Sequence, residues 1–253
     1  MQDISWGSIV STLTALFNLI GGYLWGPALL SLLVGTGLYL TIRLGGVQFQ
    51  MLPSALKLAF SRKQDQNSVG DISQFQSLMT ALAATIGTGN IAGVATAVVL
   101  GGPGAIFWMW MTALVGMATK YAEGLLAILY RVKDENGQMS GGPMYYIERG
   151  LKMKWLAMAF ALFGMIAALG TGCSVQSNSV AHAIQSTFGV PGWITGLILT
   201  AITALVMLGG IKSIARVASI IVPGMALLYI AGGLVIILTN LELLIPALKL
   251  IIT

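Results

Sequence analysis

The chain has 253 residues, of which 57% are hydrophobic and only 8% are charged, and its formal net charge is +5. A soluble domain is about 25% charged, so this composition excludes an ordinary soluble protein and indicates an integral membrane protein. The single cysteine, Cys173, excludes an intrachain disulfide and a cysteine metal cluster. The excess positive charge is explained below by membrane topology, so we expect no nucleic-acid partner.

Six apolar runs separated by polar breaks predict six membrane-spanning helices. They run from Trp25 to Ile42, Gln76 to Leu100, Gly104 to Tyr130, Trp155 to Ser186, Trp193 to Leu208 and Ala215 to Thr239. The N-terminal segment from Ile9 to Ile20 is shorter and more polar, so we expect an interfacial or packing helix there. The last segment, Leu243 to Thr253, is broken by Pro246 and Lys249 and is too short to span, since a spanning helix needs ~20 apolar residues.

The basic residues favour one orientation of these six spans. If the N-terminus lies outside, the loops Arg43 to Asp71, Arg131 to Lys154 and Gly209 to Ile214, with the span ends beside them, fall in the cytoplasm. They then hold every Lys and Arg except Lys249. Cytoplasmic loops carry such an excess. We therefore predict one multi-pass membrane domain over residues 1–253, in a prokaryotic inner membrane, with the N-terminus outside.

The second predicted span has a polar centre. Thr85 and Asn90 are five residues apart, which places them about 140° apart around an unbroken α-helix, so both cannot serve one small ligand from a straight helix. Gly87 and Gly89 each lower the helix propensity between them by ~1 kcal/mol relative to Ala. A break at these glycines would free backbone groups, and in lipid such groups persist only where they line a cavity or are enclosed by protein. Transporters use broken helices of this kind to hold substrate and ions at mid-membrane.

This stretch has two other interpretations. Gly89 and Gly93 form a pair of small residues four apart, which is a common helix-packing device in membranes. The side-chain amide of Asn90 favours a ligand-binding role over helix packing alone, because an amide group in hydrocarbon is costly without hydrogen-bond partners. The G-x-G-x-x-A pattern from Gly87 to Ala92 is rejected as a dinucleotide motif, since it lies inside a span, follows no strand and lacks the acidic residue ~20 positions further on.

A second polar cluster, residues 170–179, lies in the outer half of the fourth span. Gln176 and Asn178 in this cluster could hydrogen-bond an amino group, a carboxylate or the water shell of an ion, and the alternative is hydrogen bonding between helices. His182, the only histidine, is interpreted as a satisfied polar residue, with a proton carrier as the alternative. No paired carboxylates, metal-ligand set or Ser/His/Asp arrangement converges in the spans, so we expect no enzyme.

Four sequence blocks resemble one family, the alanine/glycine:cation symporters, also called sodium:alanine symporters. The blocks are Thr80 to Glu123 (TALAATIGTGNIAGVATAVVLGGPGAIFWMWMTALVGMATKYAE), Gly141 to Leu151 (GGPMYYIERGL), Val175 to Ala181 (VQSNSVA) and Gly209 to Ala218 (GGIKSIARVA). They follow the family's order over nearly the whole chain, and four separate blocks are far more specific than one glycine motif.

The resemblance implies an all-α, LeuT-like fold with two inverted repeats of five helices and an extra helix before the first. Residues 1–43 would hold the N-terminal segment and the extra helix. Residues 74–240 would form the first repeat, whose first core helix is interrupted near Gly87 to Gly89.

The resemblance also implies a set of site residues. The backbone amides of Thr88 and Gly89 would face the carboxylate of the substrate, and Gln176 and Asn178 would line its pocket. Sodium ligands would be the carbonyls of Ala83, Thr85 and Ile86 and the side chain of Asn90. The implied partners are alanine or glycine, the lipid bilayer and sodium, with protons as an alternative coupling ion; no cofactor is implied.

The family's second repeat would begin beyond Thr253. We therefore expect a truncated or split symporter that holds half of each site and does not transport alone. The alternative from another class is a structural or regulatory membrane subunit that packs on a full-length carrier and binds nothing itself.

Overall fold

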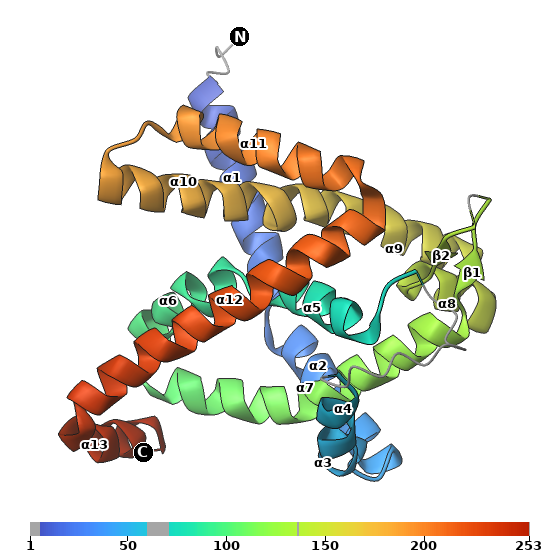
Figure 1. Ribbon diagram of the computed structural model, residues 1–253, viewed down its shortest axis with the longest axis horizontal. Helices are drawn as coiled ribbons and strands as arrows, with labels where there is room; N and C mark the ends of the chain where they lie inside the picture. The colour runs from blue at the N-terminus through green and yellow to red at the C-terminus, as the bar shows by residue number, and fades with distance from the viewer. Residues whose placement is uncertain (1–5, 60–70, 136, 253) are drawn as a thin grey trace. The chain divides into compact units, whose positions relative to one another are not determined.

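In the computed structural model, residues 6–59, 71–135 and 137–252 are described. They are almost entirely helical, which confirms the predicted all-α class (Figure 1). The chain divides into two compact units. The first comprises the residues up to Met51 together with Trp110–Ala122, and the second comprises Leu52–Met109 and Glu123–Thr253.

The first unit contains α1 (Trp6–Leu24), α2 (Pro27–Arg43), α3 (Val47–Gln50) and the middle of α7 (Gly104–Leu129). The backbones of α2 and α7 approach closely at Gly37, where an added Cβ would lie 2.8 Å from the carbonyl oxygen of Val115. Gln48 closes this packing, because its buried Nε2 donates to the Thr41 hydroxyl at 3.0 Å. A helix pair so close admits no side chain at Gly37.

The N-terminal helix is longer than we predicted. Helix α1 covers 19 residues, and an apolar stretch of 34 residues from Val10 to Arg43 is long enough to cross a membrane. The polar side chains do not shorten the helix, because a hydroxyl can bond within it. The hydroxyl of Thr14, for example, donates to the carbonyl of Val10 at 2.8 Å.

The second unit holds the remaining elements. They are α4 (Leu52–Ala59), α5 (Gln74–Thr85), η1 (Thr88–Asn90), α6 (Ala92–Gly101), the two ends of α7, β1 (Val132–Lys133), β2 (Met139–Ser140), α8 (Pro143–Gly150), α9 (Lys154–Ala167), η2 (Ala168–Ser174), α10 (Val175–Phe188), α11 (Gly192–Leu208), α12 (Gly210–Thr239) and α13 (Leu241–Ile252). The antiparallel β1–β2 hairpin was not predicted.

Each predicted span corresponds to a helix or a helix pair of the described residues. Four stretches are long and apolar enough to cross a membrane: Val10–Arg43, Gly104–Leu129, Lys154–Phe188 and Gly210–Thr239. A fifth is the bent pair of α5 with the segment Thr88–Gly101. The sixth predicted span, α11, is apolar but has only 17 residues.

Helix α5 is fixed against α12 (Figure 1). A small buried cluster joins the two helices. It consists of Met79 from α5 and of Ala218 and Val222 from α12, and apolar side chains of α5 pack around it. At the start of α5, Ser73 and Gln76 form a capping box, in which each side chain accepts a hydrogen bond from the other's backbone amide. This packing holds the helix that leads into the polar centre.

The C-terminal helix corrects one prediction. We expected Pro246 to break the last apolar segment, but α13 runs through it from Leu241 to Ile252. Proline lacks only its own amide hydrogen and its ring disturbs a single turn. In a helix of 12 residues the remaining backbone bonds maintain the helix on both sides.

Candidate functional site

The second predicted span is broken at the position that its glycines indicated. Helix α5 ends at Thr85, Ile86 and Gly87 are extended, and a short 3₁₀ turn, η1, precedes α6. The two halves are bent by 66°. We call Ile86–Asn90 the break.

The break leaves several backbone groups without backbone partners. The backbone amide of Ile86 still donates to the carbonyl of Leu82 at 2.7 Å, and the backbone amide of Asn90 donates to the carbonyl of Gly87 at 3.1 Å. Among the described residues, no backbone hydrogen bond reaches the carbonyl oxygens of Ala83, Thr85 or Ile86. The amide of Gly89 likewise donates to no backbone acceptor in the described part of the chain. Oxygen acceptors and amide donors are therefore available at one place in the helix pair.

Gln176 of α10 connects the second polar cluster to the break. Its Oε1 accepts a hydrogen bond from the backbone amide of Thr88 at 3.2 Å. A Cβ added to Gly87 would lie 3.0 Å from Nε2 and 3.2 Å from Oε1 of Gln176. Gly87 thus gives the Gln176 amide group room to reach the backbone. This contact unites two residues that are 88 positions apart in the sequence.

Not every predicted site residue meets the others. Asn178 is exposed, and its side chain makes no hydrogen bond within the described residues. The hydroxyl of Thr85 donates to the carbonyl of Ala81 at 2.9 Å, so this side chain bonds to its own helix. The structure therefore brings together Thr88 and Gln176, while Asn178 lies two residues further along α10.

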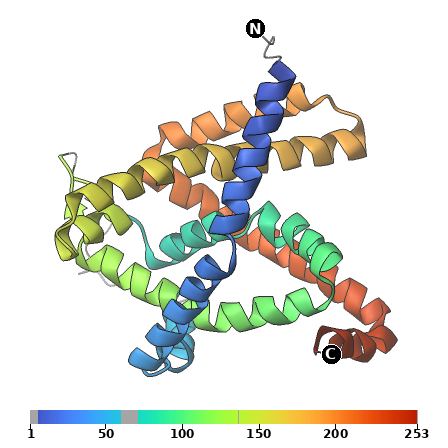
Figure 2. The same cartoon turned by 180° about the vertical axis from the view of Figure 1, so that it is seen from behind.

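Residues Ala168–Ser174 form a π-helix immediately before α10, which we did not predict. The hydroxyl of Ser174 donates to the carbonyl of Leu169, five residues back, at 2.9 Å. Cys173 is exposed in this segment. Helices α9, η2 and α10 still form one rod (Figure 2). A π turn takes one residue more than an α turn, and π segments inside α-helices are frequent at functional sites.

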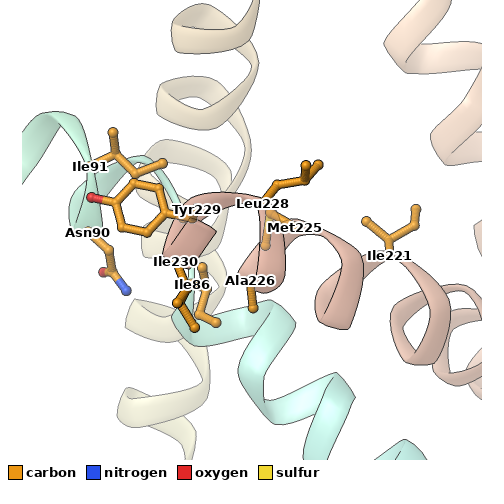
Figure 3. Close-up of a pocket in the computed structure, with 10 residues that line it drawn as sticks. Ile86, Asn90, Ile91, Ile221, Met225, Ala226, Leu228, Tyr229 and Ile230 are labelled. Carbon is orange, nitrogen blue, oxygen red and sulfur yellow. The ribbon is translucent and has the colours of Figure 1, made fainter. Parts of the chain in front are cut away.

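A cavity of about 800 Å³ lies beside the break. The break contributes Ile86, Gly87 and Asn90 together with the following Ile91, and α12 contributes Ile221, Met225, Ala226, Leu228, Tyr229 and Ile230. Figure 3 shows the side chains of α12 following one another toward the break. The lining is apolar except for the amide of Asn90 and the phenol of Tyr229. The sequence predicted α12 as a span but not its contribution to the cavity lining; the one signal was Tyr229 in an otherwise mainly aliphatic run.

This donor set is suited to two kinds of ligand. Carbonyl and amide oxygens are the ligands that hard cations prefer, and outward-facing backbone amides at a helix start favour anions such as a carboxylate. Mid-membrane sites for substrate and coupling ion are built this way in secondary transporters.

A family model described as the sodium:alanine symporter family matches residues 10–253. The chain belongs to this family. Among similar curated proteins, the sodium/alanine symporter AgcS of Methanococcus maripaludis is 62% identical over 237 residues, which are 92% of this chain and 52% of that protein. An uncharacterized transporter of Haemophilus influenzae is 57% identical over 242 residues, covering 95% of this chain and 53% of the relative. The probable sodium/glutamine symporter GlnT of Bacillus subtilis is 42% identical over 232 residues, or 90% of this chain and 48% of GlnT.

Family membership confirms the resemblance that the four sequence blocks predicted. The family is one of membrane transporters and not of enzymes, and it needs no organic cofactor. The chain spans about half the length of the curated relatives described above.

Proposed function

We propose that this chain provides one half of a sodium-coupled symporter of small neutral amino acids, with alanine or glycine as substrate. In this proposal residues 1–43 hold the N-terminal segment and extra helix, and residues 74–240 form the first repeat of a LeuT-like fold. The carrier lies in the cell inner membrane with its N-terminus outside. The observation that carries the proposal is the hydrogen bond from the Thr88 amide to Gln176 at a broken, bent span.

The substrate is bound on the amide side of the break. The backbone amides of Thr88 and Gly89 donate to the carboxylate of the amino acid, and the side chains of Gln176 and Asn178 line the pocket. In the structure the Gln176 oxygen accepts from Thr88, so it occupies the position that a carboxylate oxygen takes when the substrate binds. Gln176 then turns to the substrate and donates its Nε2 hydrogens.

Sodium is bound on the carbonyl side. The carbonyl oxygens of Ala83, Thr85 and Ile86 have no backbone donor among the described residues, and the side-chain oxygen of Asn90 joins them. These ligands are all neutral oxygens, so the positive charge of the ion is not cancelled within the set. A bound carboxylate close by completes the charge balance, and this links the binding of the two partners.

The remaining ligands belong to a second repeat. Alternating access requires one repeat to rock against the other. We therefore propose that residues 1–253 bind but do not transport without those helices. The alternative, a non-transporting subunit that packs on a full-length carrier, lacks any use for the free carbonyl oxygens.

The decisive experiment joins this chain at Thr253 to the part of the Methanococcus maripaludis relative that follows its matched half. The fusion is reconstituted in liposomes, and uptake of labelled alanine is driven by an inward sodium gradient. We expect uptake that needs sodium and is lost in Asn90→Ala. Glycine and glutamine are offered as competitors to define the substrate, and a proton gradient without sodium tests the alternative ion.

The unfused chain is tested in parallel. Isothermal titration measures sodium-dependent alanine binding, and the same liposome assay measures transport. Uptake by the unfused chain would overturn the half-carrier proposal. A fusion that transports alanine equally well with Asn90→Ala would overturn the sodium site, and a folded fusion without uptake would favour the subunit alternative.

A further inference from the structure

The junction of α8 and α9 carries basic and apolar side chains in alternation. Arg149, Lys152 and Lys154 are exposed. The apolar residues among them are also exposed, with Leu151 at 62%, Met153 at 36% and Trp155 at 66%. We call these six residues the junction surface. Glu148 directly precedes it in the sequence.

Lys152 is held in an unfavourable backbone conformation. Its φ is +57°, and it is the one residue other than glycine with a positive φ in the described ranges. It follows the end of α8, where the amide of Met153 bonds back to the carbonyl of Ile147 at 3.4 Å. Helices commonly end with a left-handed residue, and glycine usually occupies that position because it lacks a Cβ. A lysine at this position therefore lowers the stability of the turn relative to glycine.

The junction surface rests on a firm support. A Cβ on Gly150 would lie 3.2 Å from the ring of Tyr130, and one on Gly141 would lie 2.7 Å from the carbonyl of Ala127. The last residue of α8 and the turn before α8 thus lie close to the chain around the C-terminal end of α7, and α8 packs on α9. The three basic side chains therefore extend from a well-supported backbone at the start of the α9–η2–α10 rod.

We propose that the junction surface is a docking site for the headgroup of an anionic phospholipid. Basic side chains beside a span attract anionic lipids, and a tryptophan prefers the boundary between headgroups and hydrocarbon. Arg149, Lys152 and Lys154 hold the phosphate, while Leu151 and Trp155 lie at the top of the acyl chains. This inference does not depend on the transported substrate and stands if the proposed function fails.

The test measures lipid selectivity in the full chain. The chain is reconstituted in vesicles of phosphatidylglycerol and phosphatidylcholine, extracted in a neutral detergent, and the lipids that remain bound are identified by native mass spectrometry. Lys152→Gly is the main variant, and Lys212→Gln, which removes an exposed basic residue from α12, is the matched control. Thermal unfolding in detergent without lipid is recorded for all three proteins.

We expect Lys152→Gly to lower retention of phosphatidylglycerol relative to phosphatidylcholine by about fivefold, because the variant loses one direct contact between a basic side chain and the bound headgroup. The same variant should unfold at a higher temperature, because glycine accepts the positive φ without strain. Lys212→Gln should leave the lipid ratio unchanged. An unchanged ratio in Lys152→Gly, or an equal fall in Lys212→Gln, would overturn the proposal.

Discussion

Two spans of this protein are interrupted, and the interruptions differ in kind. At Ile86–Asn90 the helix stops, bends by 66° and leaves carbonyl oxygens without backbone donors in the described residues. At Ala168–Ser174 the helix continues as a π-helix within one rod of 35 residues. The first interruption offers backbone groups to a ligand, whereas the second keeps the helix continuous. Gln176, two residues after the π-helix, accepts a hydrogen bond from the Thr88 amide in the break.

The largest effect is expected from breaking the hydrogen bond between Gln176 of α10 and the Thr88 amide of the break. Gln176→Leu keeps the size of the side chain but removes the acceptor for Thr88 and the donor for the substrate carboxylate. Hydrogen bonds to charged groups contribute ~1.5–3 kcal/mol, so the apparent affinity of the fusion for alanine should fall by about 10- to 100-fold. Gln185→Leu, on the same helix and exposed, is the control. Equal loss in both variants would mean that α10 acts only as a packing helix.

A smaller loss is expected from crowding the same contact. Gly87→Ala brings a Cβ to 3.0 Å from Nε2 of Gln176, whereas Gly93→Ala meets nothing within 4 Å. The end of the Gln176 side chain can yield by a few tenths of an ångström, so stability should change little. Alanine affinity should fall by about tenfold, corresponding to one weakened hydrogen bond of ~1 kcal/mol or slightly more. If Gly93→Ala weakens uptake as much as Gly87→Ala, the space at Gly87 is not what matters.

Deletion of one residue should distinguish the interruptions. Removing Gly172 takes one residue from the π-helix and allows an α-helix that presents Gln176 on the same side, because a π turn holds one residue more. We expect a folded protein, seen by circular dichroism, with alanine affinity reduced by less than about tenfold, or ~1.4 kcal/mol. Removing Gly89 from the break should abolish uptake. Complete loss on deletion of Gly172 would show that the π-helix itself binds.

The smallest effects are expected from the hydroxyls that bond within each span. The hydroxyl of Thr85 bonds to Ala81, and that of Ser174 bonds to Leu169, both at 2.9 Å. Polar contacts in membrane helices average ~0.6 kcal/mol, so Thr85→Val and Ser174→Ala should each lower the free energy of unfolding by about that much. Chemical denaturation in detergent measures it. A loss several times larger at Ser174 would mean that its hydroxyl maintains the π-helix.

The sequence predicted the first interruption better than the second. Gly87, Gly89 and Asn90 placed the break, because low helix propensity and an amide in an apolar run are local properties. Gln176 was named as a candidate, but its bond to Thr88 depends on packing between distant helices. The π-helix was not foreseen, since glycines at 170 and 172 weaken an α-helix without selecting the π form. The contribution of Tyr229 to the cavity lining was missed because an apolar period does not indicate which face of a helix meets a cavity.

Errors at the chain ends have a simpler cause. We expected an interfacial or packing helix around Thr14 because that segment is short and polar, and we expected Pro246 to break the last segment. A hydroxyl can bond one turn back, as Thr14 does to Val10, and a single missing amide does not end a helix. The helix therefore continues through both segments, as α1 and α13.

Cys173 makes the π-helix accessible to spectroscopy in the unmodified chain. It is the one cysteine among 253 residues, and it is exposed in that segment. A thiol-specific fluorophore or spin label therefore attaches at one known position, and no other cysteine has to be replaced first. Its mobility in the presence and absence of sodium and alanine would report whether the π-helix changes when the break, bonded to the same rod through Gln176, takes up its ligands.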